Sequence, residues 1–366
     1  MTIASSLLVP ANGSAEELTL KIAATSDVHG NFFPYNFITL SPGDGSLARV
    51  ATRVRELRDS LGSDKIILLD NGDILQGQPT AYYYNFLKTD VAHPTARMLN
   101  FIGYDAQTIG NHDVETGHAV YDRYRSDLGS LPLLGANVID RKTGKPYLQP
   151  YAVINRAGVK IVVFGLLTPA IPAWLPETLW EGLEFEDMVE SAKKWVPEIM
   201  EKEKPDLLIG LFHSGHDSAK MTGEWRENAS VLVAEQVPGF DIIFMGHDHT
   251  LFNSTGKNPV NSDAVVLNPA NNANHIAEGE VTFTLDDTGK VIGKKVSGKL
   301  TSVNNLKPDS AFMAEFAPER KEILEFVSRK IGTSTGEFSV RDAYFGPSAF
   351  CLLYTSPSPR DRTRSR

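Results

Sequence analysis

The chain has 366 residues, of which 42% are hydrophobic and 22% are charged, and its formal net charge is −9 at pH 7. This composition is typical of a soluble globular protein, and the acidic charge argues against nucleic acid or an anionic membrane surface as the main partner. The length allows one large catalytic domain and part of a second one. No stretch is as long and apolar as a membrane-spanning helix, so we expect no integral membrane span.

The two ends of the chain differ in character from the rest. Residues 1–15 combine an apolar run with small residues, which is typical of the remnant of a signal peptide; a disordered tail is the alternative. A signal peptide predicts a periplasmic or secreted protein. Residues 351–366 resemble the translation of a sequencing adapter, so we interpret them as an artefact and exclude them from the fold. They contain the only cysteine, which excludes disulfides and thiolate metal sites from residues 1–350.

Apolar runs that suit buried strands recur along the chain, and each ends in a turn of Gly, Asp, Asn or His. In chain order, these runs cover residues 20–25, 66–69, 106–109, 207–212 and 242–245. Helical periodicity over 47–61 and 185–200 lies between them, and this alternation predicts an α/β domain over residues 16–305. Segments typical of strands follow at 279–285 and 291–300, and apolar residues recur at helical spacing within 309–331.

The turns after the five runs contain six of the nine histidines. Ligands of α/β sheets bind beyond the carboxyl ends of the strands, so we expect these turns to meet. Imidazole, carboxylate and amide donors suit two divalent ions of unknown identity, such as Zn, Mn, Fe or Co. Asp27 and His29 are spaced to share one ion, as are His247 and His249, and Asp73 is the carboxylate expected to bridge both. Each motif alone is also typical of an ordinary turn, and only the complete set predicts a metal centre.

With these motifs in this order, residues 18–350 resemble the calcineurin-type metallophosphoesterases. The similarity is strongest to the branch with 5′-nucleotidases, 2′,3′-cyclic-nucleotide 2′-phosphodiesterases and nucleotide-sugar hydrolases. The resemblance implies an α/β fold, a four-layer α/β/β/α sandwich with two mixed sheets. It also implies a linker helix within 306–332 and a second domain that starts at 333 and is truncated at 350. In the family, that second domain contacts the base of the substrate.

The resemblance also implies roles for individual residues. The first ion would be held by Asp27, His29, Asp73 and His249. The second would be held by Asp73, Asn111, His213 and His247. His112 matches the catalytic histidine of the family, and Glu115 replaces the family's aspartate, which steadies that histidine. The implied reaction is in-line attack of a metal-held hydroxide on phosphorus, with His112 steadying a phosphoryl oxygen or protonating the leaving oxygen.

Other polar residues near the motifs have other predicted roles. The residues that bind the substrate are not assigned, although Asn31 and His275 are candidates. Asp113 and Asp248 are expected to support turns rather than to bind metal. His93 precedes a proline and is expected to be structural.

Several functions fit the same ligands. The first is 5′-nucleotidase activity on a small-molecule nucleotide, and the alternatives are a 2′,3′-cyclic-nucleotide 2′-phosphodiesterase and a UDP-sugar hydrolase. Residues 34–37 are more similar to the cyclic-nucleotide branch. A dinuclear hydrolase of other esters, such as thiosulfate adducts, would use the same metals. The non-enzyme alternative is a relic metal-binding protein. The oligomeric state is not predicted.

Overall fold

The computed structural model describes residues 16–255 and 260–333, and the chain divides into two compact units, residues 1–327 and 328–366. The fold of the first unit contains two six-stranded sheets, each with parallel and antiparallel pairs. The predicted α/β class with mixed sheets is therefore confirmed. The predicted signal remnant at 1–15, the adapter-like segment at 351–366 and all but the first residue of the predicted second domain at 333–350 lie outside the described residues.

The first sheet holds the strands that end in the first three predicted turns. Its strands, in spatial order, are β19 (Val291–Ser302), β18 (His275–Leu285), β1 (Glu16–Thr25), β4 (Ile66–Asp70), β5 (Ala106–Thr108) and β6 (Leu133–Leu134). Strands β1, β4, β5 and β6 pair in parallel, whereas β18 is antiparallel to both of its neighbours. The three parallel strands β1, β4 and β5 therefore point their carboxyl ends to the same edge.

The second sheet holds the strands that end in the remaining two turns. Its strands, in spatial order, are β16 (Leu251–Asn253), β17 (Val265–Pro269), β15 (Ile242–Met245), β12 (Leu207–His213), β10 (Val159–Leu167) and β9 (Tyr151–Arg156). The four inner strands are parallel. Short strands form smaller sheets: β2 (Tyr35–Asn36) with β3 (Ser41–Pro42); β7 (Val138–Asp140) with β8 (Lys145–Pro146) and β11 (Leu183–Phe185); and β13 (Met221–Thr222) with β14 (Trp225–Arg226).

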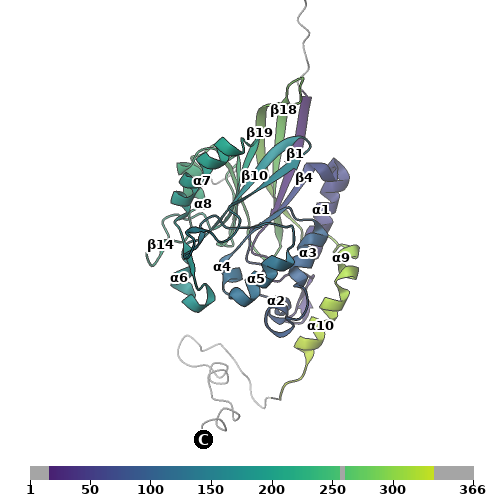
Figure 1. The fold of residues 1–366 in the computed structure, drawn as a ribbon. Coiled ribbons are helices and arrows are strands. Elements are labelled where there is room, and N and C mark those ends of the chain that lie inside the picture. The colour runs from purple at the N-terminus through teal and green to yellow at the C-terminus, as the bar shows by residue number, and fades with distance from the viewer. Residues whose placement is uncertain (1–15, 256–259, 334–366) are drawn as a thin grey trace, which may run out of the picture. The chain divides into compact units, whose positions relative to one another are not determined.

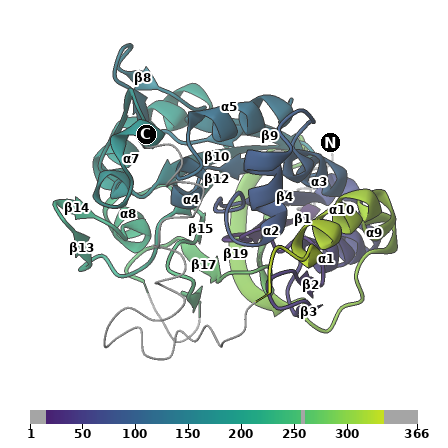
Figure 2. The ribbon, with the colours of Figure 1, turned by 90° about the horizontal axis from the view of Figure 1, so that it is seen from below.

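Helices cover the outer face of each sheet (Figures 1 and 2). On the first sheet and around its edge lie α1 (Leu47–Leu61), α2 (Pro79–Tyr82), the π-helix η2 (Tyr83–Leu87), α3 (Pro94–Ile102), α4 (Asn111–Val114), α5 (His118–Asp127), α9 (Ser310–Glu315) and α10 (Ala317–Ser328). With the second sheet lie α6 (Ile171–Trp174), α7 (Met188–Lys202) and α8 (Ser230–Gln236). Two 3₁₀ turns are η1 (Ser63–Lys65) and η3 (Glu177–Leu179).

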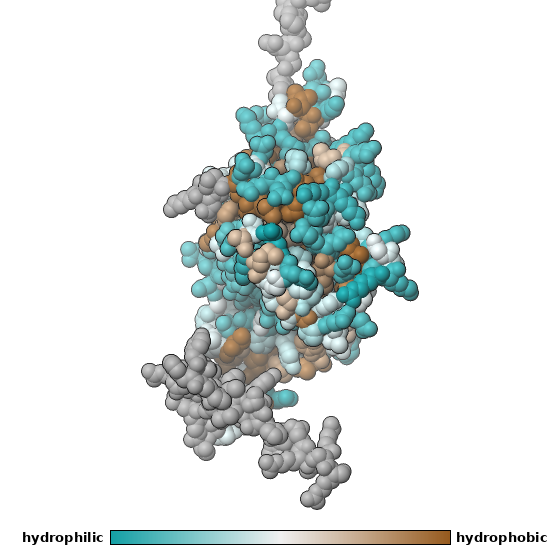
Figure 3. Space-filling model, turned by 90° about the vertical axis from the view of Figure 1, so that its left-hand side faces the viewer, coloured by the Kyte–Doolittle hydropathy of each residue, from teal (hydrophilic) through white to brown (hydrophobic). Residues whose placement is uncertain are grey.

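Three apolar clusters separate these layers. In β4, Ile66 and Leu68 pack toward the helices, whereas Ile67 and Leu69 pack toward the second sheet. Successive side chains of a strand point to opposite faces, so a strand buried on both faces reads as a continuous apolar run. A third cluster lies between the second sheet and helices α7 and α8. The outer surface on that side is mostly hydrophilic, with smaller hydrophobic areas (Figure 3).

The predicted helix boundaries agree with the structure at α1 and differ at two other helices. Helix α7 begins after the predicted start at 185, because the Asp187 carboxylate caps it by accepting the backbone N–H groups of Val189 (2.8 Å) and Glu190 (3.0 Å). The region of the predicted linker helix, 306–332, contains two separate helices, α9 and α10. Pro318 has no N–H to donate to Ala314, so the first helix ends and a new one begins. None of the described helices is long and apolar enough to span a membrane.

His93 caps helix α3, as expected of a structural residue, and its burial predicts a pH effect on stability. Its ring is 1% exposed, Nδ1 accepts the Thr95 N–H (3.3 Å), and Nε2 donates to Asn85 Oδ1 (2.9 Å). Burial, with the nearby Arg123, lowers the pKa of His93 to about 3. In the unfolded chain, His93 therefore binds a proton near pH 6.5, whereas in the folded protein it stays neutral at that pH. Stability falls as the pH drops below 6.5, by about 1.4 kcal/mol per pH unit until it nears 3.

Urea denaturation of His93→Asn between pH 7 and pH 4.5 tests this expectation. Asparagine is a good helix cap, so we expect a modest cost at pH 7 and a shallower fall in unfolding free energy with acidification. His118→Gln in α5 is the matched control, because it removes a different histidine. If the unfolding free energies of the native protein and His93→Asn fall in parallel with pH, His93 is not the source of the acid destabilisation.

Candidate metal centre

The five predicted turns meet where the carboxyl ends of the parallel strands of the two sheets face each other. Hydrogen bonds join the sheets at this edge: Asn71 Nδ2 donates to the Phe212 carbonyl (2.8 Å), and Thr108 Oγ1 donates to the Leu211 carbonyl (3.0 Å). The convergence that the sequence predicts, over more than two hundred residues of chain, is therefore present.

The backbone of these turns adopts a conformation that is rare for residues other than glycine. Five candidate ligands have left-handed φ angles between 49° and 72°: Asp27, His29, Asp73, His247 and His249. Such a conformation costs of the order of 1–3 kcal/mol per residue and clusters at functional sites. It turns the chain sharply at the strand end. Asp27 and His29 thereby face the same group, whereas His247 and His249 face different groups, so the prediction that these two histidines share one ion is wrong.

Two glycines allow the turns to approach each other closely. A Cβ atom on Gly110 would lie 2.1 Å from Asp73 Oδ1, and a Cβ atom on Gly246 would lie 2.0 Å from Ser26 Oγ and 2.6 Å from Asp27 Oδ2. Any side chain at these positions would push a candidate ligand out of place. Gly246 directly follows β15 of the second sheet, and Asp27 lies in the turn after β1 of the first, so this contact also sets the distance between the two turns.

Three candidate ligands form the first group: Asp27, His29 and His249. The two Nε2 atoms of His29 and His249 lie 3.0 Å apart, and Asp27 Oδ1 lies 3.2 Å from His249 Nε2 and 3.9 Å from His29 Nε2. Four ligands at 2.0–2.1 Å from a tetrahedral ion stand about 3.3 Å from one another. The spacing in this group is thus the spacing that a shared divalent ion requires.

The second group combines Asp73, His213 and His247, with Asn111 between the two rings. Asn111 Oδ1 lies 3.0 Å from His213 Nε2 and 2.8 Å from His247 Nδ1, and His213 Nε2 lies 3.1 Å from Asp73 Oδ2. His213 Nδ1 donates to the Asn71 carbonyl (2.6 Å), which fixes the ring with Nε2 toward the group. The structure thus places Asp73 in this group. The same nitrogen, His213 Nε2, also lies 4.0 Å from Asp27 Oδ1 of the first group.

The donor atoms of both groups fit divalent cations. Asp73 Oδ2 is buried and has no aligned hydrogen-bond donor within the described residues. Burial by itself would raise the pKa of Asp73, yet the charge of His213 holds it below its usual range. In turn, burial would lower the pKa of His213, and Asp73 with Asp27 raises it to about 10. The two buried carboxylates, Asp27 and Asp73, therefore require positive charge nearby. Divalent cations that bind nitrogen and oxygen ligands would supply this charge.

His112 lies beside the second group on the short helix α4, and Glu115 directly follows that helix. The backbone N–H of His112 donates to Asp73 Oδ1 (2.7 Å), and its side-chain Nδ1 contacts the carboxylate of Glu115. Asp113 points the other way and accepts four backbone N–H groups, those of residues 73, 74, 75 and 110, at 2.8–2.9 Å. Asp113 therefore holds the turns of two strands together, which agrees with the predicted supporting role.

The structure also shows supporting residues that the sequence analysis missed. Glu227 Oε1 accepts a hydrogen bond from His247 Nε2 (3.0 Å), and this contact, with Thr222 and Lys220, lowers the pKa of Glu227 to about 2. Gln76 Oε1 lies 3.1 Å from His29 Nδ1, and Asn271 Nδ2 lies 3.1 Å from His249 Nδ1. Gln76 follows a motif closely, but Glu227 lies in a loop with no repeated pattern that would identify it.

Asn31 and His275, the two candidate substrate-binding residues, have different surroundings in the structure. Asn31 Nδ2 donates to the Val28 carbonyl (3.1 Å) and to Asn272 Oδ1 (2.9 Å), so its side chain braces the turn that carries Asp27 and His29. His275 begins β18 and pairs with Ser302 of β19. No hydrogen bond found between described residues joins His275 to the candidate ligands.

Comparisons with known proteins agree with this geometry. Residues 20–251 match the family model of the calcineurin-like phosphoesterases. A 2′,3′-cyclic-nucleotide 2′-phosphodiesterase/3′-nucleotidase of Yersinia enterocolitica is 29% identical over 92% of this chain and 55% of that protein. A 5′-nucleotidase of Vibrio cholerae is 29% identical over 87% of this chain and 61% of that protein.

The solved structures give the same result for the fold. The calcineurin-like phosphoesterase YfkN from Bacillus subtilis superposes with a TM-score of 0.74 at 26% identity, over 86% of this chain and 100% of that chain. The chain spans about half the length of the curated relatives that it matches first. The chain belongs to the calcineurin-like phosphoesterase family and is related to its 5′-nucleotidases and 2′,3′-cyclic-nucleotide phosphodiesterases.

Proposed function

We propose that this chain is a dinuclear metal-dependent phosphoester hydrolase that acts on nucleotides. The observation that carries the proposal is the pair of ligand groups, which meet at His213: its Nε2 lies 3.1 Å from Asp73 Oδ2 in the second group and 4.0 Å from Asp27 Oδ1 in the first. Asp27, His29, Asp73 and His249 would hold one cation, and Asp73, Asn111, His213 and His247 the other. Two such cations supply charge neutralisation for the phosphoryl oxygens and a lowered pKa for the attacking water.

The residues around the metal groups support the remaining parts of the reaction. A cavity of about 550 Å³ is lined by the candidate ligands Asn111 and His247 and also by His112 and Glu115. A phosphoryl group placed against the metal ligands would thus lie in the same cavity as the His112 ring. His112 would then donate a proton to the leaving oxygen or a hydrogen bond to a phosphoryl oxygen, while Glu115 orients the ring.

The second candidate activity is hydrolysis of 2′,3′-cyclic nucleotides. It is favoured by the similarity to the Yersinia enterocolitica protein, which covers 92% of this chain. Ring opening of a cyclic diester needs the same metal ligands and the same acid, since its leaving group is also a ribose oxygen. The two activities therefore differ only in how the substrate is held.

Turnover of AMP, 2′,3′-cyclic AMP and a UDP-sugar by the purified, metal-loaded protein tests both proposals. We expect hydrolysis of at least one of them, complete loss after treatment with a chelator, and recovery on addition of Mn²⁺, Co²⁺ or Zn²⁺. The ratio of the three kcat/KM values assigns the substrate. A fully metal-loaded protein that hydrolyses none of them, nor an aryl phosphate, would favour the relic metal-binding protein.

A further inference from the structure

The ring of His247 contacts three groups that come from different segments of the chain. Its Nδ1 lies 2.8 Å from Asn111 Oδ1, toward the second group, and its Nε2 donates to Glu227 Oε1 (3.0 Å). The indole of Trp174, at the end of α6, lies beside the ring, with ring centroids 5.5 Å apart and planes inclined by 37°. Because Nε2 carries the proton in this arrangement, Nδ1 is unprotonated and can bind a cation.

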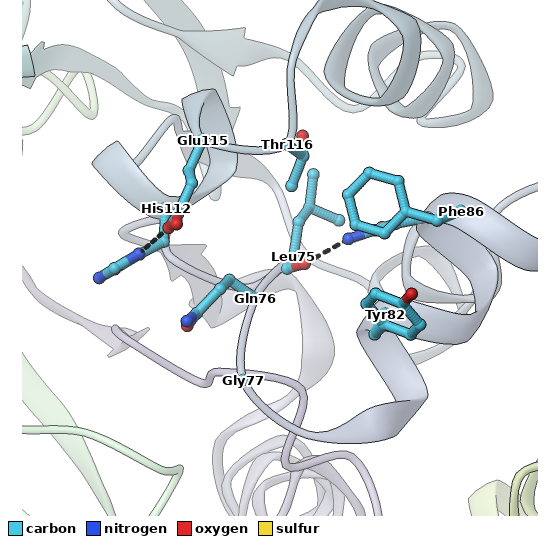
Figure 4. A pocket seen from close by; sticks show the side chains of 9 residues that line it. Leu75, Gln76, Gly77, Tyr82, Phe86, His112, Glu115 and Thr116 are labelled. Carbon is cyan, nitrogen blue, oxygen red and sulfur yellow. Dashed lines mark hydrogen bonds and ion pairs between the residues drawn. The ribbon is translucent and has the colours of Figure 1, made fainter. Parts of the chain in front are cut away.

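The contact between His247 and Glu227 is more sheltered from water than the other histidine–glutamate pair of the site. In that other pair, His112 contacts Glu115 (Figure 4), and the two side chains are 36% and 42% exposed. The side chains of His247 and Glu227 are only 10% and 8% exposed. A hydrogen bond is electrostatically stronger where water is excluded, so Glu227 can fix the His247 ring more firmly than Glu115 can fix His112.

Glu227 is held in place by contacts other than the one with His247. Its Oε1 also accepts a hydrogen bond from Lys220 Nζ (2.9 Å), and its Oε2 accepts one from Thr222 Oγ1. Its backbone carbonyl accepts a hydrogen bond from Ser214 Oγ (2.9 Å), in the turn after β12. The carboxylate therefore keeps its position without help from the ring that it contacts.

The two proposed cations would share the carboxylate of Asp73 and differ in the charge of their other ligands. The first would also be bound by the carboxylate of Asp27, whereas the second would be bound by the neutral amide of Asn111. Glu227 brings a further carboxylate to the second group through its hydrogen bond to His247. The outer ring nitrogens of both histidines in the first group face side-chain amides instead. Glu227 thus offsets the lower negative charge of the second group.

We propose that Glu227 is a positioning residue for the second cation, which fixes the ring of His247 and adds negative charge from outside the ligands. The inference rests on the dinuclear centre of the proposed function. A carboxylate that binds the outer nitrogen of a metal-binding histidine contributes about 10- to 100-fold to metal affinity. No hydrogen bond between described residues joins Glu227 to Asp27, His29 or His249. Removal of Glu227 therefore weakens the second cation and spares the first.

Calorimetric titration of the metal-free protein with Mn²⁺, together with metal content by mass spectrometry, tests this role. The native protein should bind two ions. For Glu227→Ala we expect the Kd of one ion to rise about 10- to 100-fold and the Kd of the other to stay within about twofold. Glu227→Gln keeps an oxygen that can accept from Nε2 but loses the charge, so its loss should be smaller. Glu224→Gln, which changes an exposed carboxylate of the same loop, is the matched control and should retain both native Kd values.

A second variant identifies which ion depends on Glu227. His29→Ala removes a ligand of the first group and should leave the second ion bound. When Glu227→Ala is added to His29→Ala, the Kd of this remaining ion should rise about 10- to 100-fold. An unchanged Kd in the double variant would show that Glu227 does not act on the second ion, and would overturn the inference.

Other outcomes separate the role of Glu227 from the proposed function. Unchanged Kd values in Glu227→Ala, or equal losses of both ions, would overturn the positioning role while the proposed function stands. If the native protein binds two ions but hydrolyses no phosphoester, the proposed function fails, and the Kd values still decide the role of Glu227. Binding of fewer than two ions by the native protein would overturn both.

Discussion

Asp73→Ala is expected to lose both metal ions and phosphoesterase activity. Asp73 is buried, its Oδ2 lies 3.1 Å from His213 Nε2, and its charge also acts on His29 in the first group. Partners that merely support a metal ligand contribute about 10- to 100-fold to affinity or activity. A carboxylate between two ions contributes more, so kcat/KM should fall by more than about 100-fold. Metal content by mass spectrometry and initial rates measure both effects.

The matched variants separate the loss of charge from a general loss of structure. Asp73→Asn keeps the volume and an oxygen that can accept the His112 N–H, so it should fold normally and still bind less metal. Asp122→Asn, on the surface of α5, should retain native metal content and native rates. An Asp73→Ala protein that contains no metal and yet turns over at the native rate would end the two-metal proposal.

The candidate ligands could be predicted because their chemistry and their position coincide. A histidine or aspartate directly after a buried parallel strand can lie only at the carboxyl edge of the sheet, so strand prediction alone brings Asp27, Asp73 and Asn111 together. The division of the ligands between two sheets was not derivable from strand patterns. It depends on the pairing of β1 with β4 and of β10 with β12, which is set by packing between distant segments.

Two features that the sequence did not predict are the contact of Glu227 with His247 and the break between α9 and α10. The first depends on a tertiary contact, and the second depends on a single proline. Glu227 follows no buried strand, and its contact with His247 exists only because the loop after β14 folds back over the site. Periodicity likewise did not separate α9 from α10, because the apolar spacing continues across Phe316. There, the missing N–H of Pro318 overrides the pattern.

His112→Ala is expected to leave the metal centre intact and to reduce kcat by about 10²- to 10⁴-fold, the contribution of a positioned acid. The link between residue 112 and Asp73 is a backbone N–H bond of 2.7 Å, which alanine preserves. Metal content should therefore equal that of the native protein. His118→Ala, on the next helix, is the control. Loss of both metal and activity in His112→Ala would place this residue among the ligands instead.

The leaving group distinguishes the two possible roles of His112. An acid that protonates the leaving oxygen matters for a ribose alkoxide and hardly at all for p-nitrophenolate, which departs without a proton. A hydrogen bond to a phosphoryl oxygen would matter equally for both esters. If His112→Ala loses much more activity on AMP than on p-nitrophenyl phosphate, the ring is the acid. Glu115→Gln should then show the same selectivity with a smaller loss, because Glu115 acts only by orienting His112.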